Sequence, residues 1–454
     1  MAEHSRQQKA AHQLRLLSEA LDSGRLGPVK RLVNTLSTAE IGNLLESLPP
    51  GKRSIVWGLV DAEDDGEVLL HVGDEVRESL IAEMDQDEIV AAAESLDLDD
   101  LAELMEDLPD QVIDEVLKSM DRENRERLEQ VLSYPEDTAG RLMNPDVITV
   151  RADVTVDVVL RYLRLRGEMP EHTDHLFVVS RRHQYLGRIS LTALLLSEPG
   201  RPINQMLDTD EQPAIPVTAT AAEVASQFED HDWISAPVVD GNNILLGRIT
   251  IDDVVDIIRE QAEHQALSAA GLDEDEDMFS PVPRAARRRM VWLGVNLATA
   301  FLAASVVGRF EDTIEKVVAL AVLMPIVAGM GGNAGTQVLA LMVRGLALGQ
   351  VGASNAKVLL WKEVRVALLN GLTLGALLAG VVWLWFKDLP LSLVIYAALI
   401  MNLLFASLAG VLVPLTLRRL GFDPALASGI FLTTVTDVMG FFVFLGLGTL
   451  ILLH

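Results

Sequence analysis

The chain has 454 residues, of which 50% are hydrophobic and 22% are charged, and its formal net charge is −28. Residues 284–454 contain 13 Lys and Arg against 7 Asp and Glu, whereas the residues before them contain 24 against 58, so a strongly acidic soluble part precedes a mildly basic apolar part. This acidity excludes nucleic acid as a partner, because nucleic-acid phosphates require Lys and Arg for neutralisation. The absence of cysteine excludes disulfides and thiolate chemistry, and an enzyme is the least favoured class because no nucleophile–base constellation or phosphate loop is present.

The first 134 residues repeat with a period of 12. Apolar residues recur at this spacing, and most are followed by a residue that favours a turn. The apolar positions are Leu36, Leu48, Val60, Val72, Met84, Leu96, Leu108, Met120 and Leu132. Each unit is one short helix and a turn, too small to fold alone, so we expect stacked repeats that form an all-α superhelix over residues 1–135.

Acidic residues crowd the C-terminal half of this expected superhelix, in the run DLDDLAELMEDLPD. Asp99 and Glu103 lie four residues apart, which puts them on one face of a helix. Like charges at that spacing repel each other unless a cation lies between them. The spacing alone is explained equally well by an acidic face in contact with solvent.

Residues 136–263 contain an internal duplication, since LGRISLTALL at 186 recurs as LGRITIDDVV at 246. A β-rich run that leads into a helix, twice, resembles a tandem pair of α/β CBS domains, here at 136–199 and 200–263. Such pairs often bind adenine nucleotides through a Thr and an Asp at the end of the second copy. Thr250, Asp252 and Asp253 match that pattern, whereas the first copy lacks the acid. A structural pair without nucleotide is favoured over one that binds ATP.

After a connector at 264–286, five apolar stretches are long enough to cross a bilayer, which requires about 20 residues. We assign them to a transmembrane domain at 287–454. The stretches are 290–308, 317–343, 366–386, 389–417 and 424–453.

The basic residues that flank these stretches define an orientation. Arginine and lysine cluster at 284–289, at 344–365 and at 418–419, which all fall on the side of the N-terminal part. Because cytoplasmic loops carry the excess of basic residues, we expect a cytoplasmic N-terminus and a C-terminus outside.

Asp437, in LTTVTDVMGFF, is the only acidic residue in the middle of a predicted span. An ionised group at that depth is costly, and such residues usually face a bundle interior or an aqueous path. No Lys or Arg lies in the middle of the other stretches, so a role in an ion path is favoured over a paired or protonated structural Asp. Thr433 adds a hydroxyl one helical turn away.

The second stretch contains the glycine-rich run MPIVAGMGGNAGTQ. Helix packing explains glycines such as Gly332, which also expose the backbone. Packing does not explain Asn333, Thr336 and Gln337, which are costly in lipid. Amide, carbonyl and carboxylate oxygens suit Mg2+ or Ca2+, and Mg2+ keeps several waters and needs few carboxylates. Composition alone does not separate Mg2+ from Ca2+, Mn2+ or Co2+.

The run PIVAGMGGNAGTQ, followed later by DPALASGIFLTTVTDVMG, resembles the MgtE family of magnesium channels and transporters over essentially the whole chain. The resemblance implies a homodimer in a bacterial cytoplasmic membrane, with five spans per subunit and a central pore gated by cytoplasmic Mg2+. It implies Asp437 as the ion-site residue of the pore, with Asn333 as the matching amide. Gly332 and Thr433 complete the expected pore set.

The same resemblance implies regulatory Mg2+ sites on acids of the cytoplasmic part and of the pore mouth. The implied ligands are Asp99, Glu103, Asp232, Asp253, Asp256 and Asp423. Part of the connector becomes a helix that plugs the pore when cytoplasmic Mg2+ is high. In the run IIREQAEHQAL this chain lacks acids that relatives often have, so we expect some sensor sites near the pore mouth to be weaker or missing.

Two other functions stay open. An ion-coupled secondary transporter of divalent cations such as Mg2+ and Co2+ would use Asp437 as a proton or Na+ relay, and its flux would depend on a gradient. A membrane-anchored receptor would conduct no ion, and it leaves Asn333 and Asp437 unexplained.

Overall fold

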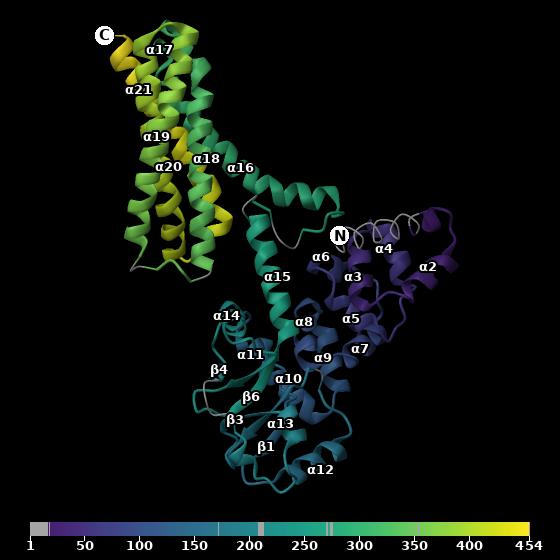
Figure 1. The fold of residues 1–454 in the computed structure, drawn as a ribbon. Helices are drawn as coiled ribbons and strands as arrows, with labels where there is room; N and C mark the ends of the chain where they lie inside the picture. Colours follow the sequence, from purple (N-terminus) through teal and green to yellow (C-terminus); the bar gives the residue numbers. More distant parts are fainter. Residues whose placement is uncertain are drawn as a thin grey trace. The chain divides into compact units, whose positions relative to one another are not determined.

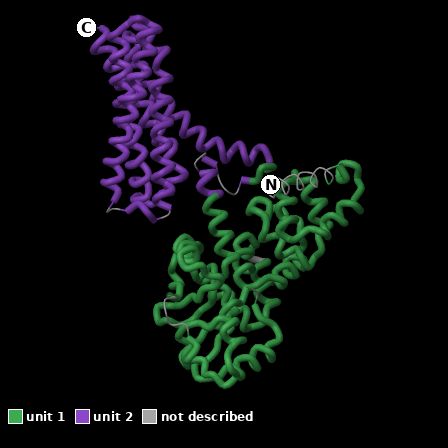
Figure 2. Tube along the Cα trace, in the orientation of Figure 1, with its two compact units in different colours: residues 1–262, 277–280 green, residues 263–276, 281–454 purple. Residues whose placement is uncertain are grey.

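The computed structural model describes residues 17, 19–170, 172–207, 213–268, 271–272, 276–347, 349–352 and 355–453. Residues 1–16 of the expected superhelix therefore lie outside the described residues. The chain divides into two compact units (Figure 2). The first consists of Met1–Ala262 with Asp277–Ser280, and the second of Glu263–Glu276 with Pro281–His454.

The first unit begins with a run of short helices, coloured purple to blue in Figure 1. They are α2 (Leu26–Val33), α3 (Thr38–Glu46), α4 (Pro50–Trp57), α5 (Asp65–Leu70), α6 (Asp74–Ile81), α7 (Gln86–Glu94), α8 (Leu98–Leu104), the 3-10 helix η1 (Met105–Asp107), α9 (Asp110–Ser119) and α10 (Arg122–Leu132). Apart from α5, which begins three residues late, each of these α-helices starts on the predicted 12-residue register. The predicted helical repeat is confirmed.

The turn residues of the repeat start the helices because they occupy the N-cap positions. Ser37 and Asp85 form capping boxes with Glu40 and Glu88. Asp121 accepts hydrogen bonds from two backbone N–H groups at the start of α10. Pro49, Gly73, Asp97 and Pro109 hold the same position in α4, α6, α8 and α9.

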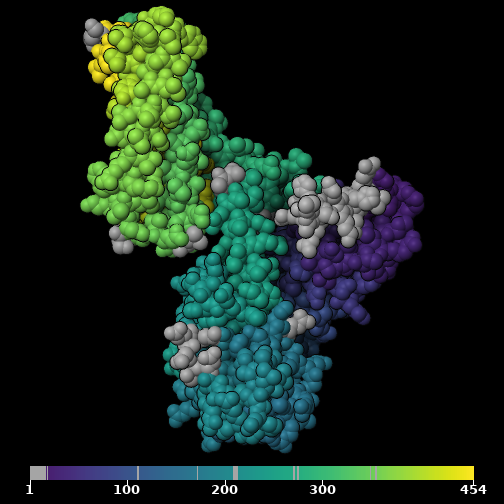
Figure 3. All heavy atoms as spheres, viewed as in Figure 1, coloured from purple at the N-terminus to yellow at the C-terminus, as the bar shows by residue number. Residues whose placement is uncertain are grey.

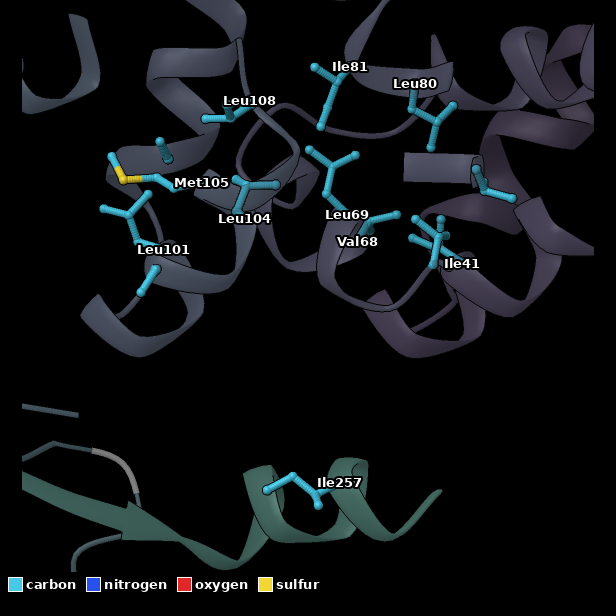
Figure 4. Close-up of a cluster of buried hydrophobic side chains, with 14 of the residues drawn as sticks. Ile41, Val68, Leu69, Leu80, Ile81, Leu101, Leu104, Met105, Leu108 and Ile257 are labelled. Atoms are coloured by element: carbon cyan, nitrogen blue, oxygen red, sulfur yellow. The ribbon is translucent and has the colours of Figure 1, made fainter. Parts of the chain in front are cut away.

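All nine repeated apolar residues lie in or against one hydrophobic core. Figure 4 shows part of it, with Leu101 and Leu104 of α8 and Ile257 of α15 (Ile251–Ser268). The same core includes Val224 and Val238 from the second half of the unit. The blue repeats and the teal α/β part are accordingly in direct contact in the space-filling view (Figure 3). The superhelix is therefore packed onto the second α/β copy.

The α/β part is a duplicated module. Its elements before α15 are α11 (Ala139–Leu142), β1 (Thr149–Arg151), α12 (Val156–Arg166), β2 (His175–Val179), β3 (Tyr185–Ser190), α13 (Leu191–Leu196), η2 (Ile203–Gln205), β4 (Ile215–Pro216), α14 (Ala221–His231), β5 (Ser235–Val239) and β6 (Leu245–Thr250). Two three-stranded sheets, β1-β2-β3 and β4-β5-β6, each have one parallel and one antiparallel pair. Their registers shift between Val178 and Val179 and between Val238 and Val239, which are corresponding positions. The predicted duplication is confirmed.

The second unit contains five helices that are long and apolar enough to cross a membrane. They are α16 (Val282–Gly308), α18 (Ala319–Ala347), α19 (Ala356–Phe386), α20 (Leu389–Arg419) and α21 (Pro424–Leu452), with the short α17 (Glu311–Lys316) after the first. Helix α20 packs against α18, α19 and α21, whereas α16 packs chiefly against α21. Only 6% of the most apolar stretch of α16 is buried within the protomer, against 56% for α20. Much of the apolar surface of α16 is thus exposed in the described part of the protomer.

The described residues of the expected connector, 264–286, include the end of α15, the start of α16 and the non-helical Asp277–Ser280. We call Asp277–Ser280 the strap. Nη2 of Arg53 lies 2.8 Å from Oδ2 of Asp277, and both side chains are buried. The carboxylate of Glu75 accepts hydrogen bonds from the backbone N–H of Asp277 and from the hydroxyl of Ser280, at 3.3 and 2.6 Å. The strap is thereby attached to the superhelix.

Candidate metal sites and ion pathway

Carboxylates of α8 and α15 face each other where the superhelix packs onto the second sheet. Ile257 holds α15 in the shared core, and this brings the acids of the two helices together. We call them the acidic cluster. Its members are Asp97, Asp99, Asp100, Glu103, Asp252, Asp253, Asp256 and Glu260.

Burial and mutual repulsion raise the pKa of several cluster carboxyls. Burial, followed by the charge of Asp100, raises the pKa of Asp99 to about 7. Burial, followed by the charge of Asp253, raises the pKa of Asp100 to about 7. The pKa of Asp253 rises to about 8, from burial and then from Asp99. Negative charge is therefore under-compensated here, as expected where a cation binds.

The second half of the cluster lies one to two turns further along α15. Burial, and then Glu103 and Asp256, raise the pKa of Glu260 to about 7. Arg77 offsets part of this charge, because its guanidinium lies 2.9 Å from Glu103 and 3.2 Å from Asp107. Burial nevertheless raises the pKa of Glu103 above its ordinary value.

The chemistry of the cluster fits a hydrated ion better than a closed cage. Nδ2 of Asn144 donates to Oδ1 of Asp99 at 3.0 Å. Oδ2 of Asp253 accepts from both the N–H and the hydroxyl of Thr250, at 3.2 and 3.0 Å. Among the described residues, no three acidic or histidine side chains converge to hold a bare metal ion. Mg2+, which keeps several of its waters, can bridge carboxylates that do not converge.

The raised pKa values predict that Mg2+ binding releases protons. An acid whose pKa is higher when α8 packs against α15 binds protons more tightly in that state. The contact between the two helices therefore loses stability as pH rises from about 4 toward 7–8. Mg2+ must then displace these protons at pH 7 but not at pH 9. Calorimetry in two buffers with different ionisation enthalpies will measure the release.

Two variants test whether the released protons come from the acidic cluster. Asp253→Asn should reduce the release at pH 7, whereas Glu94→Gln, at an exposed acid of α7, should leave it unchanged. Equal proton release at pH 7 and pH 9 would contradict the prediction.

The other expected regulatory residues lie elsewhere. Asp232 is exposed at the C-cap of α14, with a left-handed φ of 51°. Among the described contacts, none joins it to the cluster. Asp423 is the N-cap of α21, and its Oδ2 lies 2.8 Å from Nε2 of His264. His264 thus lies against an expected metal ligand, in the run where the sequence indicates fewer acids than in relatives.

The expected nucleotide residues are Thr250 and Asp252. The hydroxyl of Thr250 already donates to Asp253, whereas Asp252 is half exposed and lies 3.3 Å from Nε2 of His172. In the first copy, Ser190 caps α13 and accepts a hydrogen bond from the backbone of Ala193, which corresponds to Asp253. The two copies therefore start their last helix with different chemistry.

Asp437 lies in an open groove of about 470 Å³ between α16 and α21. Helix α21 contributes Thr433 and Thr434 beside it, and α16 contributes Asn296 and Thr299. We did not predict a role for Asn296 and Thr299. The sequence does contain an indication for Asn296, because it is an amide within an otherwise apolar stretch.

Asn333 lies on a different surface. Together with Thr336 and Gln337 it is exposed on α18, and these residues do not line the groove at Asp437. The carbonyl of Gly332 accepts a hydrogen bond from the Thr336 hydroxyl at 2.9 Å. Within one protomer, the two expected halves of the pore set are therefore not brought together.

Comparisons with known proteins identify the family. A family model described as MgtE, divalent cation transporter, matches residues 324–447, the MgtE intracellular N domain matches 36–137, and the CBS domain matches 139–199 and 207–260. The magnesium transporter MgtE of Thermus thermophilus is 31% identical, over 96% of this chain and 98% of its own length. This chain belongs to the MgtE family. The MgtE magnesium transporter of Bacillus subtilis is 28% identical, over 94% of this chain and 95% of its own.

A solved structure also aligns with the chain. It is the crystal structure of the cytosolic domain of the Mg2+ channel MgtE in complex with ATP, with 27% identity and a TM-score of 0.48, and it covers 53% of this chain and 98% of that one. The MgtE model spans both Asn333 and Asp437, and the MgtE N-domain model spans the acids of α8. The members of the acidic cluster on α15 lie within the second CBS match.

Proposed function

We propose that this MgtE-family protein is a homodimeric Mg2+ channel that imports Mg2+ across the bacterial cytoplasmic membrane and closes when cytoplasmic Mg2+ is high. One observation carries the transport proposal: polar groups lie on accessible surfaces of apolar helices. Asp437 opens into a groove, and Asn333 and Gln337 are exposed on α18. Lipid contact with these groups would be costly, so water and a second subunit are the better surroundings.

A second copy of the chain would cover these surfaces. Most of the apolar stretch of α16 and the polar residues Asn333, Thr336 and Gln337 of α18 are exposed in the described part of the protomer. The first α/β copy also exposes large apolar side chains, with Leu165 at 86% and Leu196 at 83%. Exposed apolar area of this kind is typical of subunit contacts and supports a homodimer.

The pore chemistry supports a hydrated divalent cation. Asp437 supplies one carboxylate per subunit, and Thr433, Asn333 and the backbone near Gly332 supply neutral oxygens. Mg2+ retains several waters and is bound through few carboxylates, which suits this set. The relatives named as magnesium transporters support Mg2+ as the cargo.

The acidic cluster supports the gating proposal. Mg2+ would bind between α8 and α15 at Asp99, Glu103, Asp253 and Asp256, and would favour the compact, closed state. Without Mg2+, repulsion would favour separation and opening, a population shift toward the state that the ligand does not bind.

Other parts of the gating proposal rest on the family alone. They are a plug role for the connector and further Mg2+ sites at Asp232 and Asp423. ATP at Thr250 and Asp252 is a further proposal, in which the nucleotide would compete with Asp253 for the Thr250 hydroxyl.

Flux into liposomes tests the function. Purified protein in liposomes with an internal Mg2+ indicator should admit Mg2+ at a rate that does not change when a pH or Na+ gradient is imposed or collapsed. Dependence on either gradient would favour a secondary transporter. Absence of divalent influx would favour a receptor and reject the proposal.

A further inference from the structure

Helix α20 carries a fully buried amide among the membrane helices. Asn402 is 0% exposed, and its Nδ2 donates to the backbone carbonyl of Val327 on α18 at 2.8 Å. Its Oδ1 is buried and has no hydrogen-bond partner among the described residues. Burying an amide whose hydrogen bonds are incomplete costs free energy. Apolar packing alone would not select this residue.

Two glycines from two other helices enclose this amide. A Cβ at Gly331 of α18 or at Gly440 of α21 would collide with the side chain of Asn402. Both helices pack against α20, and they also pack against each other. Asn402 therefore occupies the space that the two glycines leave, and acts as a spacer where three helices meet.

The spacer lies at the level of the expected pore residues. Gly331 precedes Asn333 by two residues, and Gly440 follows Asp437 by three. At a rise of about 1.5 Å per residue, both pore residues lie within about 5 Å along their helix axes of the glycine that contacts the amide. A change in the size of residue 402 would thus move the backbones that carry Asn333 and Asp437.

We infer that Asn402 is a positioning residue that sets the separation of α18 and α21 and thereby determines which divalent cations pass. The inference rests on the proposed channel function. Asn402 does not contact the ion, and it acts through the two helices. Divalent cations differ in radius and in the strength of their hydration, so a small change in pore width alters their relative rates more than it alters folding.

Relative influx of Mg2+, Ca2+ and Co2+ into liposomes tests this role. Asn402→Ala removes the spacer and should change the Mg2+:Ca2+ influx ratio by roughly fivefold or more. Gly331→Ala pushes on the amide from the opposite side and should also change the ratio. The control is Ser407→Ala, which removes a different buried polar group, a hydroxyl, from α20 and should leave the ratio unchanged.

The outcomes separate the inference from the function beneath it. Parent protein without divalent influx would reject the channel proposal. Parent protein that conducts, with parental ratios in both Asn402→Ala and Gly331→Ala, would overturn the positioning role. An equal fall in all three rates with constant ratios would also overturn it, because that is the effect of a merely structural residue. If Asn402→Ala does not fold, the influx ratio of Gly331→Ala decides, because its added Cβ would collide with the side chain of Asn402.

Discussion

Asp437→Ala should reduce Mg2+ influx into liposomes by roughly 100-fold or more, because a carboxylate attracts each unit of cation charge by about 4 kcal/mol at 4 Å in a medium of effective dielectric 20. Asp437 is the only acidic residue in the middle of a span, and it opens into the groove between α16 and α21. Asp437→Asn keeps the size of the side chain and removes the charge, so it should lose nearly as much. Stopped-flow indicator measurements will give the rates.

Charge and location can be separated by two further variants. Asp437→Glu keeps the carboxylate and should retain part of the flux. Glu315→Gln removes an exposed acid from α17, outside the spans, and should conduct like the parent. Parental Mg2+ influx through a folded Asp437→Ala protein would show that this carboxylate is not on the ion path.

The double variant Asp253→Ala and Asp256→Ala should leave the channel open at millimolar Mg2+. The change removes two expected ligands on α15, while Asp100 still repels Asp252 and Glu103 still repels Glu260. Mg2+ can then no longer bridge α8 and α15, while the remaining acids of the two helices still repel each other. The Mg2+ concentration for half-closure should therefore rise roughly tenfold or more, within the usual range of coupling energies. Patch-clamp recording at graded cytoplasmic Mg2+ will measure it.

A matched control lies on the same α/β copy. Glu229→Ala with Asp230→Ala removes two exposed acids of α14 that are not members of the acidic cluster, and half-closure should not change. Normal closure of the Asp253 and Asp256 double variant would contradict the gating role of the cluster. It would leave the role of Asp437 in conduction untouched.

Features with a local cause could be predicted from the sequence. The 12-residue register follows from the caps Ser37 and Asp85, each directly after an apolar residue, Leu36 or Met84, and all of these act within one turn. The duplication and the five apolar helices follow from repeats and hydropathy, and the structure has all of them. The helix α5 is the exception to the register, since it begins only after the acidic turn at 61–64.

Features that depend on contacts between distant segments were not predicted. The helices α8 and α15 face each other because both pack into the core that contains Ile257. No periodic pattern in the sequence predicts this contact. Asn296 and Asn402 were missed because a single amide barely lowers the hydropathy of a long apolar stretch, whereas Asn333 stands close to the polar residues Thr336 and Gln337. Asp437 was found because an ionisable residue clearly lowers the hydropathy of an apolar stretch. The assigned roles of the expected ligands stay predictions.

The strap changes how a shortened protein would behave. Arg53 and Asp277 form a buried ion pair, and the strap ends one residue before Pro281, at the entry to α16. A truncated protein that keeps only the α/β module and the spans would lose the acidic repeats. It would also lose the contacts that attach the strap, which leads into the first span. Altered conduction in such a truncated protein would have two causes. A single replacement of Arg53, with every acid of the repeats retained, separates them.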